Sequence, residues 1–193
     1  EEQVRVADIS IHLLDAFAQC GAPRSVLSIG SGGGLHEAFL ALRHPAVTIC
    51  ALDLLGAYAE GDLPNLRVLE DDVLQPAFAA TLPKADFVFS IECLEHIQED
   101  ARVFARMAEL VEPGGSLYLE VPFASPSEQA DPEIRQREWK NHEHVRPGYS
   151  AQQLEGLARD HGLTDIEVHG AFWFPVQPMV WLAHQQLGAD AQR

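Results

Sequence analysis

Hydrophobic and polar positions follow two different periods along this chain, one typical of helices and one typical of strands. Residues 4–20 place Ile9, Leu13 and Phe17 three to four positions apart, which predicts an amphipathic helix. Short apolar runs predict strands at 25–30, 47–54, 65–70, 85–91, 116–121 and 164–170. Helical patterns are predicted at 36–43, 99–111 and 150–161.

This alternation of strands and helices predicts the α/β class. We expect a doubly wound, mostly parallel sheet with helices on both faces, because each crossover between parallel strands must cover the sheet. The runs at 25–30, 85–91 and 116–121 are nearly continuously apolar, as central parallel strands are. With 193 residues, the chain suits a single domain over 1–193, with ligands at the carboxyl ends of the strands.

Two segments do not fit the alternation. Residues 123–147 predict a loop of about 25 residues with Trp139 in it, and loops of that length are usually lids or binding loops. The tail, 171–193, is apolar and then polar, with Pro175 and Pro178, and predicts an irregular segment with a short helix and no assignable seventh strand. Its aromatic run 172–174 leaves three interpretations open: an acceptor pocket, core packing or a homodimer contact.

Charge and cysteine content narrow the class of partner. The chain has 29 acidic and 13 basic residues, so we expect no nucleic-acid partner. No apolar run has the length of a membrane span, and the acidic opening EEQVRVADIS is not typical of a secretory signal. Cys20, Cys50 and Cys93 are far apart in apolar segments, which indicates reduced thiols. We therefore expect a cytoplasmic protein without membrane partners.

The stretch VLSIGSGGGL, residues 26–35, joins the first strand to a helix through four glycines. A glycine turn before a helix N-terminus is a ligand cradle, since the backbone can approach the ligand closely there. The dinucleotide fingerprint G-x-G-x-x-G/A would need a small residue at Leu35, which disfavours a nicotinamide oxidoreductase. A phosphate P-loop is also disfavoured, because no Gly-Lys-Ser/Thr follows.

The register Gly30-x-Gly32-x-Gly34 resembles the nucleoside-binding loop of class I S-adenosylmethionine-dependent methyltransferases. Further segments resemble the family's motifs in order: Asp53 after the second strand, then 71–73, ADFVFSIECLEHI at 85–97, LVEPGGSLYLEVP at 110–122 and EHVRPGYSAQQLEGLARDHGL at 143–163. The similarity extends over about 25–170. One such motif would be weak, whereas the ordered series is specific.

The resemblance implies S-adenosylmethionine as cofactor, S-adenosylhomocysteine as product and methyl transfer to an O, N or C atom of a small molecule. It implies that Asp53 holds the ribose hydroxyls and that the end of the fourth strand touches the methionine part. It also implies that Asp72 lies beside the adenine, with Asp71 and Glu70 as competing candidates for that role. The implied cofactor-binding residues are Gly30, Ser31, Gly32, Gly34, Asp53, Leu54, Asp72, Val73, Ser90 and Ile91.

One departure from the family pattern concerns Ser28. The family usually has an acidic residue two positions before the first glycine, and this chain has Ser28 there. We expect the methionine amino group to bind a carbonyl or a water instead. The departure also motivates an alternative, a non-catalytic methyltransferase-like domain with a regulatory or assembly role.

Candidate acid–base residues lie after the fourth and fifth strands. His144 is the first candidate, because a loop after the fifth strand should lie above the cofactor. His142 and Glu92 are the second-choice candidates. Glu92, Glu95 and His96 have helix-like spacing, and His142 and His144 lie two positions apart, which raises a metal site as an alternative. No sequence feature shows that these groups converge, and a metal site requires a definite ligand set, so we expect no metal.

Overall fold

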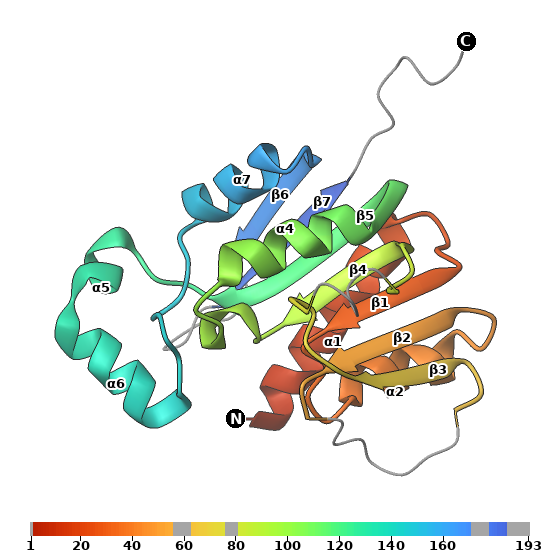
Figure 1. Ribbon diagram of the computed structural model, residues 1–193, viewed down its shortest axis with the longest axis horizontal. Coiled ribbons are helices and arrows are strands. Elements are labelled where there is room, and N and C mark those ends of the chain that lie inside the picture. The colour runs from red at the N-terminus through yellow and green to blue at the C-terminus, as the bar shows by residue number, and fades with distance from the viewer. Residues whose placement is uncertain (1, 56–62, 76–80, 171–177, 185–193) are drawn as a thin grey trace.

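A seven-stranded sheet organises the structure, a computed structural model that describes residues 2–55, 63–75, 81–170 and 178–184 (Figure 1). The strand order is β3-β2-β1-β4-β5-β7-β6. The strands are β1 Ser25–Ile29, β2 Thr48–Asp53, β3 Leu66–Glu70, β4 Ala85–Ile91, β5 Val111–Pro122, β6 Thr164–Gly170 and β7 Pro178–His184. β1 to β5 run parallel, and β7 is antiparallel to β5 and β6. The order reverses between β1 and β4, where ligands of this fold class bind.

Helices cover both faces of the sheet, as the alternating pattern predicts. α1 Glu2–Gln19 and α2 Leu35–Arg43 cover one face, and α4 Asp100–Leu110 and α7 Ala151–Asp160 cover the other (Figure 1). Successive residues of a strand point to opposite faces. Phe87 and Phe89 therefore pack toward Leu13 and Phe17, whereas Val88 packs in the core that contains Phe104. The α/β, doubly wound fold predicted from the sequence is confirmed.

Helix ends follow their capping residues closely. The Ser150 hydroxyl accepts a hydrogen bond from the backbone N–H of Gln153, and Oε1 of Gln153 accepts one from the backbone N–H of Ser150, so α7 begins with a reciprocal capping box. The N-terminal helix predicted at 4–20 and the strand pattern up to residue 170 are likewise confirmed within a few residues. None of the described helices combines the length and the apolar character needed to cross a bilayer.

The prediction of a loop and a short helix in the tail is wrong for residues 178–184, which form the seventh strand that the sequence left unassigned. β7 lies within that tail and inserts between β5 and β6, pairing Leu119 with Trp181 and Val168 with Trp181 across its two edges. Pro178 is the first residue of the strand, a position that proline tolerates. The MVWLAH run that follows has the β-branched and aromatic content of a strand. The aromatic run 172–174 lies outside the described residues.

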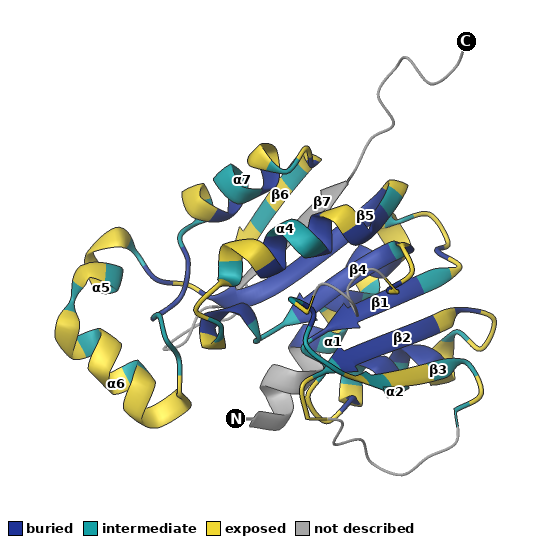
Figure 2. Cartoon of the chain, viewed as in Figure 1, coloured by how far each residue is buried: buried dark blue, intermediate teal, exposed yellow. Residues whose placement is uncertain are grey.

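The prediction of one long loop over 123–147 is also wrong, because two helices occupy most of that segment. These are α5 Pro126–Ala130 and α6 Pro132–His142. Each begins with a cap that the sequence contains. Ser125 and Glu128 form a capping box, and Asp131, just before Pro132, accepts hydrogen bonds from the N–H groups of Glu133 and Ile134. Neither helix has a buried residue, and Figure 2 shows both as largely exposed beyond the carboxyl edge of the sheet.

Candidate functional site

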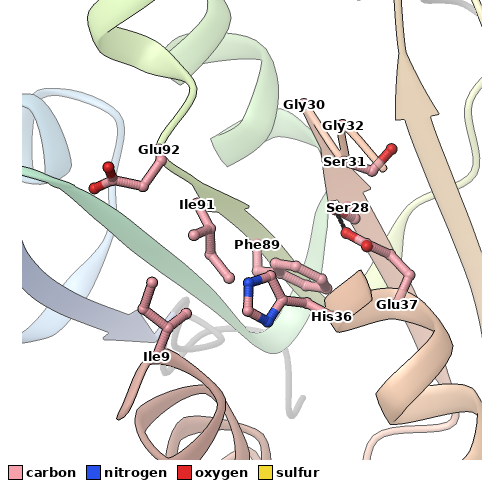
Figure 3. A pocket seen from close by; sticks show the side chains of 10 residues that line it. All are labelled: Ile9, Ser28, Gly30, Ser31, Gly32, His36, Glu37, Phe89, Ile91 and Glu92. Carbon is pink, nitrogen blue, oxygen red and sulfur yellow. Dashed lines mark hydrogen bonds between the residues drawn. The ribbon is translucent and has the colours of Figure 1, made fainter. Parts of the chain in front are cut away.

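A cavity of about 260 Å³ lies at the carboxyl ends of β1 and β4, where the strand order reverses. α2 begins beside it, and α1 contributes one residue to its wall. The lining residues are Ile9, Ser28, Gly30, Ser31, Gly32, His36, Glu37, Phe89, Ile91 and Glu92 (Figure 3). Three of the predicted cofactor-binding glycine-loop residues and Ile91 are among them. The location is the one expected for a ligand of a doubly wound sheet.

The glycine loop has a backbone that only glycine adopts easily. Gly30, Gly32 and Gly34 all have positive φ, at 74°, 52° and 73°. A Cβ atom added to Gly30 would lie 2.1 Å from the Sγ of Cys93, so a side chain there would collide with the end of β4. At Gly32 nothing lies within 4 Å of such an atom, so the space beside the loop is open. The bend therefore leaves room for a ligand directly against the main chain.

Asp53 joins this loop to the end of β2. Its Oδ2 accepts a hydrogen bond from the N–H of Gly32 at 2.7 Å, and its Oδ1 accepts one from the N–H of Leu55 at 3.0 Å. The carboxylate is only partly buried, so it also faces the open space. Asp53 thus braces the bend of the loop and presents negative charge next to it. Its predicted contact with ribose hydroxyls stays a prediction.

Glu37 was not predicted from the sequence, yet its carboxylate bonds to Ser28, the residue that stands where the family pattern has an acidic one. It projects from the first turn of α2, is 2% exposed, and accepts a short hydrogen bond from the hydroxyl of Ser28 (Figure 3). Its Oε2 is buried and has no hydrogen-bond partner among the described residues. Burial raises the pKa of Glu37 to about 7, although the Ser28 hydroxyl opposes that shift.

His36, the neighbour of Glu37, also lines the cavity and was missed from the sequence. Burial lowers its pKa below the ordinary value, so the ring is neutral near pH 7. A neutral imidazole can accept a hydrogen bond from a ligand without repelling a cationic one. Nothing in the local pattern distinguishes it from a helix-surface histidine. Only the packing of α2 against the sheet turns it toward the cavity.

Of the other predicted cofactor-binding residues, one lies in the cavity wall and the rest lie outside it. Ile91 lies in the wall, whereas the side chain of Ser90 is fully buried outside the lining set, as strand alternation requires. Leu54 is 62% exposed at the end of β2 and offers an apolar surface beside Asp53. Asp72 accepts a hydrogen bond from the N–H of Leu74, so its carboxylate closes a local turn. The cofactor contacts of these residues, and of Val73 and Gly34, stay predictions.

Glu92, the first residue after β4, has a strained backbone. Its φ is 49°, in the left-handed region that non-glycine residues rarely adopt, and its N–H donates to the carbonyl of Glu120 at 2.9 Å. The strand pairing with β5 thus continues one residue beyond β4 while the Glu92 side chain lines the cavity. Such strain is typical of functional sites.

The segment after α6 folds back onto the short helix η1 Leu94–His96. The N–H of Val145 donates to the carbonyl of Glu95 at 2.9 Å, and Nη1 of Arg146 donates to the carbonyls of Leu94 and Ile97 at 2.8 and 2.7 Å. The same nitrogen lies 3.0 Å from Oδ2 of Asp100. These bonds, between residues about 50 positions apart, hold His144 over the end of β4.

His144 lies in a cluster with Glu95 and His96. One ligand atom from each of the three residues lies within 4.8 Å of the other two. The rings of His144 and His96 are 4.7 Å apart between centroids, nearly perpendicular. His142 is exposed, with its ring 5.2 Å from that of His144. Neither His144 nor His142 lines the cavity, whereas Glu92, the other acid–base candidate, does.

Comparisons with known proteins agree with this architecture. A family model described as a methyltransferase domain matches residues 2–168. An uncharacterised methyltransferase of Mycobacterium tuberculosis is 38% identical over 120 residues, which cover 60% of this chain and 58% of that protein. A ubiquinone biosynthesis O-methyltransferase of Azotobacter vinelandii is 34% identical over 110 residues, which cover 51% of this chain and 44% of that protein.

Solved structures share the fold at low identity. An O-methyltransferase family protein from Burkholderia thailandensis superposes with a TM-score of 0.70 at 20% identity, covering 95% of this chain and 56% of that one. The chain therefore spans less than two thirds of the length of each of these three relatives.

Proposed function

The chain belongs to the class I methyltransferase family, and from that membership we propose that it transfers a methyl group from S-adenosylmethionine to an oxygen atom of a small molecule. When bound, this cofactor supplies an electrophilic methyl group on a positively charged sulfur. The observation that supports the proposal best is the cavity beside the glycine loop. Glu37 lies in its wall, and Asp53 accepts a hydrogen bond from Gly32 of the same wall. Both acidic groups are complementary to a ligand with ribose hydroxyls and a cationic amino acid end.

The glycine loop and Asp53 fit the adenosine part of the cofactor. Gly32 and Gly33 leave open space where a side chain would stand, so ribose can lie against the backbone. A carboxylate accepts hydrogen bonds from two neighbouring hydroxyls without needing a proton of its own. The exposed side chain of Leu54, next in sequence, offers apolar contact to a base. The residues present thus fit the group that the family uses.

Glu37 fits the amino end of the methionine part. Its Oε2 is buried without a hydrogen-bond partner among the described residues, and both Glu37 and Ser28 line the cavity. An ammonium ion favours the charged carboxylate and so compensates for the burial that raises the pKa of Glu37. In this proposal Glu37 supplies, from α2, the negative charge that Ser28 lacks in β1.

The acceptor side lies next to Glu92 and the cluster around His144. Positioning the acceptor in line is worth up to ~7–11 kcal/mol, and removing its proton adds ~10²–10⁴ in rate. His144 is the proposed base, because hydrogen bonds of Val145 and Arg146 fix the segment that carries it. An oxygen acceptor is favoured because the Azotobacter vinelandii relative is an O-methyltransferase.

Isothermal titration with S-adenosylmethionine tests cofactor binding. We expect the protein to bind, and Asp53→Ala to weaken binding by more than ~1 kcal/mol, because a charged hydrogen bond is lost. Glu112→Ala, a change at a half-buried carboxylate at the opposite edge of the sheet, is the control. If the affinity is unchanged in Asp53→Ala, the ribose assignment is wrong.

Transfer of a radiolabelled methyl group to a panel of small hydroxyl, carboxyl and amine compounds tests the reaction. We expect label on an oxygen acceptor. Label on nitrogen or carbon would overturn the choice of oxygen. Cofactor binding without transfer to any compound would favour the non-catalytic alternative. The hydrogen bond between Ser28 and Glu37 argues against that alternative, because it brings a carboxylate to Ser28.

A further inference from the structure

Beyond the cofactor cavity, we propose that Glu95, His96 and His144 form a binding site for a divalent first-row transition metal ion, with Zn²⁺ the best match to its donors. The three residues come from two segments about 50 positions apart. Their nearest ligand atoms all lie within 4.8 Å of one another. Ligands about 2.1 Å from a metal lie roughly 3.0–3.4 Å apart, so small side-chain rotations close the site. His96 is exposed and can rotate without disturbing the core.

The donor set is the first argument for a metal. Two imidazoles and one carboxylate are a combination that zinc and other first-row metals use in proteins, commonly with the remaining positions open to water or substrate. The carboxylate belongs to Glu95, whose side chain is fully buried. A divalent ion stabilises a buried carboxylate through its charge, and His144 already lies 4.0 Å from Oε1 of Glu95.

The orientation of His144 is the second argument. Its Nε2 faces Glu95, 4.0 Å from Oε1, while its Nδ1 faces the other way and lies 3.6 Å from Oε2 of Glu138. Histidines that bind metals generally direct their second nitrogen toward a carboxylate, which fixes the tautomer and strengthens the ligand. Glu138, on α6, is placed for that role. α6 thereby contributes to the cluster although it buries no residue of its own.

The location suggests what the metal would do. Glu95 follows Glu92 by three residues, and Glu92 lines the cofactor cavity, so the metal would lie on the acceptor side. A metal there would hold an acceptor oxygen and lower its pKa, which is Lewis-acid assistance. With the metal bound, His144 would serve as a ligand and the metal would take over its proposed role as base. This role rests on the proposed methyl transfer, whereas the metal site itself does not. The class of acceptor it favours has a hydroxyl with a second oxygen nearby, since such a pair can occupy two open positions.

Metal binding is measured on the whole chain without cofactor or acceptor. Co²⁺ is titrated into metal-free protein and followed by visible absorption, and Zn²⁺ is then added as a competitor. We expect one Co²⁺ per chain, displaced by Zn²⁺. His96→Ala and His144→Ala are each expected to weaken binding at least ~100-fold, since the loss of a direct ligand exceeds the ~10–100-fold effect of an outer partner. Glu138→Gln, such a partner, is expected to weaken it ~10-fold.

His169→Ala is the matched control, because His169 is an exposed histidine on β6 outside the cluster. Equal loss of binding in that variant, or wild-type protein that binds no Co²⁺ and no Zn²⁺, would overturn the proposal. S-adenosylmethionine titrations of the same variants separate the two proposals. Normal cofactor affinity in His96→Ala with metal binding lost would show two independent sites, and metal binding without cofactor binding would reject only the proposed function.

Discussion

The two sides of the proposed active site are built in different ways. On the glycine-loop side, short hydrogen bonds join neighbours in the sheet, such as Gly30 N–H to the Leu52 carbonyl at 2.8 Å, and the surrounding side chains are buried. On the other side, α5 and α6 project beyond the sheet without a buried residue (Figure 2). That side is fixed chiefly by the contacts of Val145 and Arg146 with η1. The cofactor side is thus part of the core, whereas the acceptor side is attached to it.

This difference suggests separate roles. A cofactor that a whole family shares suits a site made of core strands, because their geometry is determined by close packing. An acceptor that differs between members suits exposed helices, whose surface tolerates substitution at little cost in stability. We therefore expect substitutions on the first side to affect folding and cofactor binding together, and those on the second to affect acceptor chemistry alone.

The largest effect is expected from Gly30→Ala. Its Cβ would overlap Cys93 at 2.1 Å, and the positive φ adds a cost of about 1 kcal/mol. We expect the free energy of unfolding to fall by ~2–4 kcal/mol in denaturant titrations and cofactor affinity to fall with it. Gly33→Ala is the control, because nothing lies within 4 Å of a Cβ there. Equal effects at both positions would contradict the tight fit assigned to Gly30.

Arg146→Ala tests the attachment of the acceptor side. Arg146 donates to the carbonyls of Leu94 and Ile97 and pairs with Asp100, all partly or fully buried, so its loss should lower the free energy of unfolding by about 2 kcal/mol. Cofactor affinity should change less than twofold, whereas methyl transfer should fall at least tenfold because His144 loses its position. A parallel loss of cofactor affinity would show that the two sides are not separate.

Glu37→Gln tests the cofactor side through pH. The pKa of Glu37 is raised from 4.5 to about 7, so the wild-type fold loses stability as pH rises through that range, where the folded carboxyl must ionise. At pH 8 we expect Glu37→Gln to be about 3 kcal/mol more stable than wild type, and at pH 4 the two should be equal. Cofactor affinity should fall at least tenfold in the same variant.

The control for that measurement is Glu109→Gln, an exposed carboxyl paired with Arg106 on α4. Its thermal melts should show the wild-type dependence on pH. Between pH 5 and pH 8, the melting temperature of the wild type should fall relative to that of Glu37→Gln. If it does not fall, the assignment of a buried ionisable carboxyl is contradicted.

The smallest effect on stability is expected from Trp139→Ala on α6. Trp139 is 58% exposed, so its removal should change the free energy of unfolding by less than ~0.5 kcal/mol. If α6 contacts the acceptor, the KM for the acceptor should rise while cofactor affinity stays the same. An unchanged KM would place the acceptor away from this face of α6.

Much of the fold was readable from local patterns. The glycine loop, Asp53 at the end of its strand, and the Ser150 cap all depend on residues a few positions apart, and the structure places them as predicted. The caps at Ser125 and Asp131 were equally local, so α5 and α6 were predictable, although the length of the segment suggested a loop. β7 was harder to predict from the sequence, because Pro175 and Pro178, before and at its first residue, suggest irregular structure. Only the sheet order shows that a strand fits between β5 and β6.

The sequence by itself determined which elements form and where the chain bends, because hydrophobic period, capping and glycine act over a few residues. Only the tertiary structure decided which distant side chains meet. Glu37 reaches Ser28 because α2 packs on β1, and His144 reaches Glu95 because Arg146 bonds across to η1. Such encounters depend on the packing of whole elements, and no periodicity along the chain encodes that packing directly.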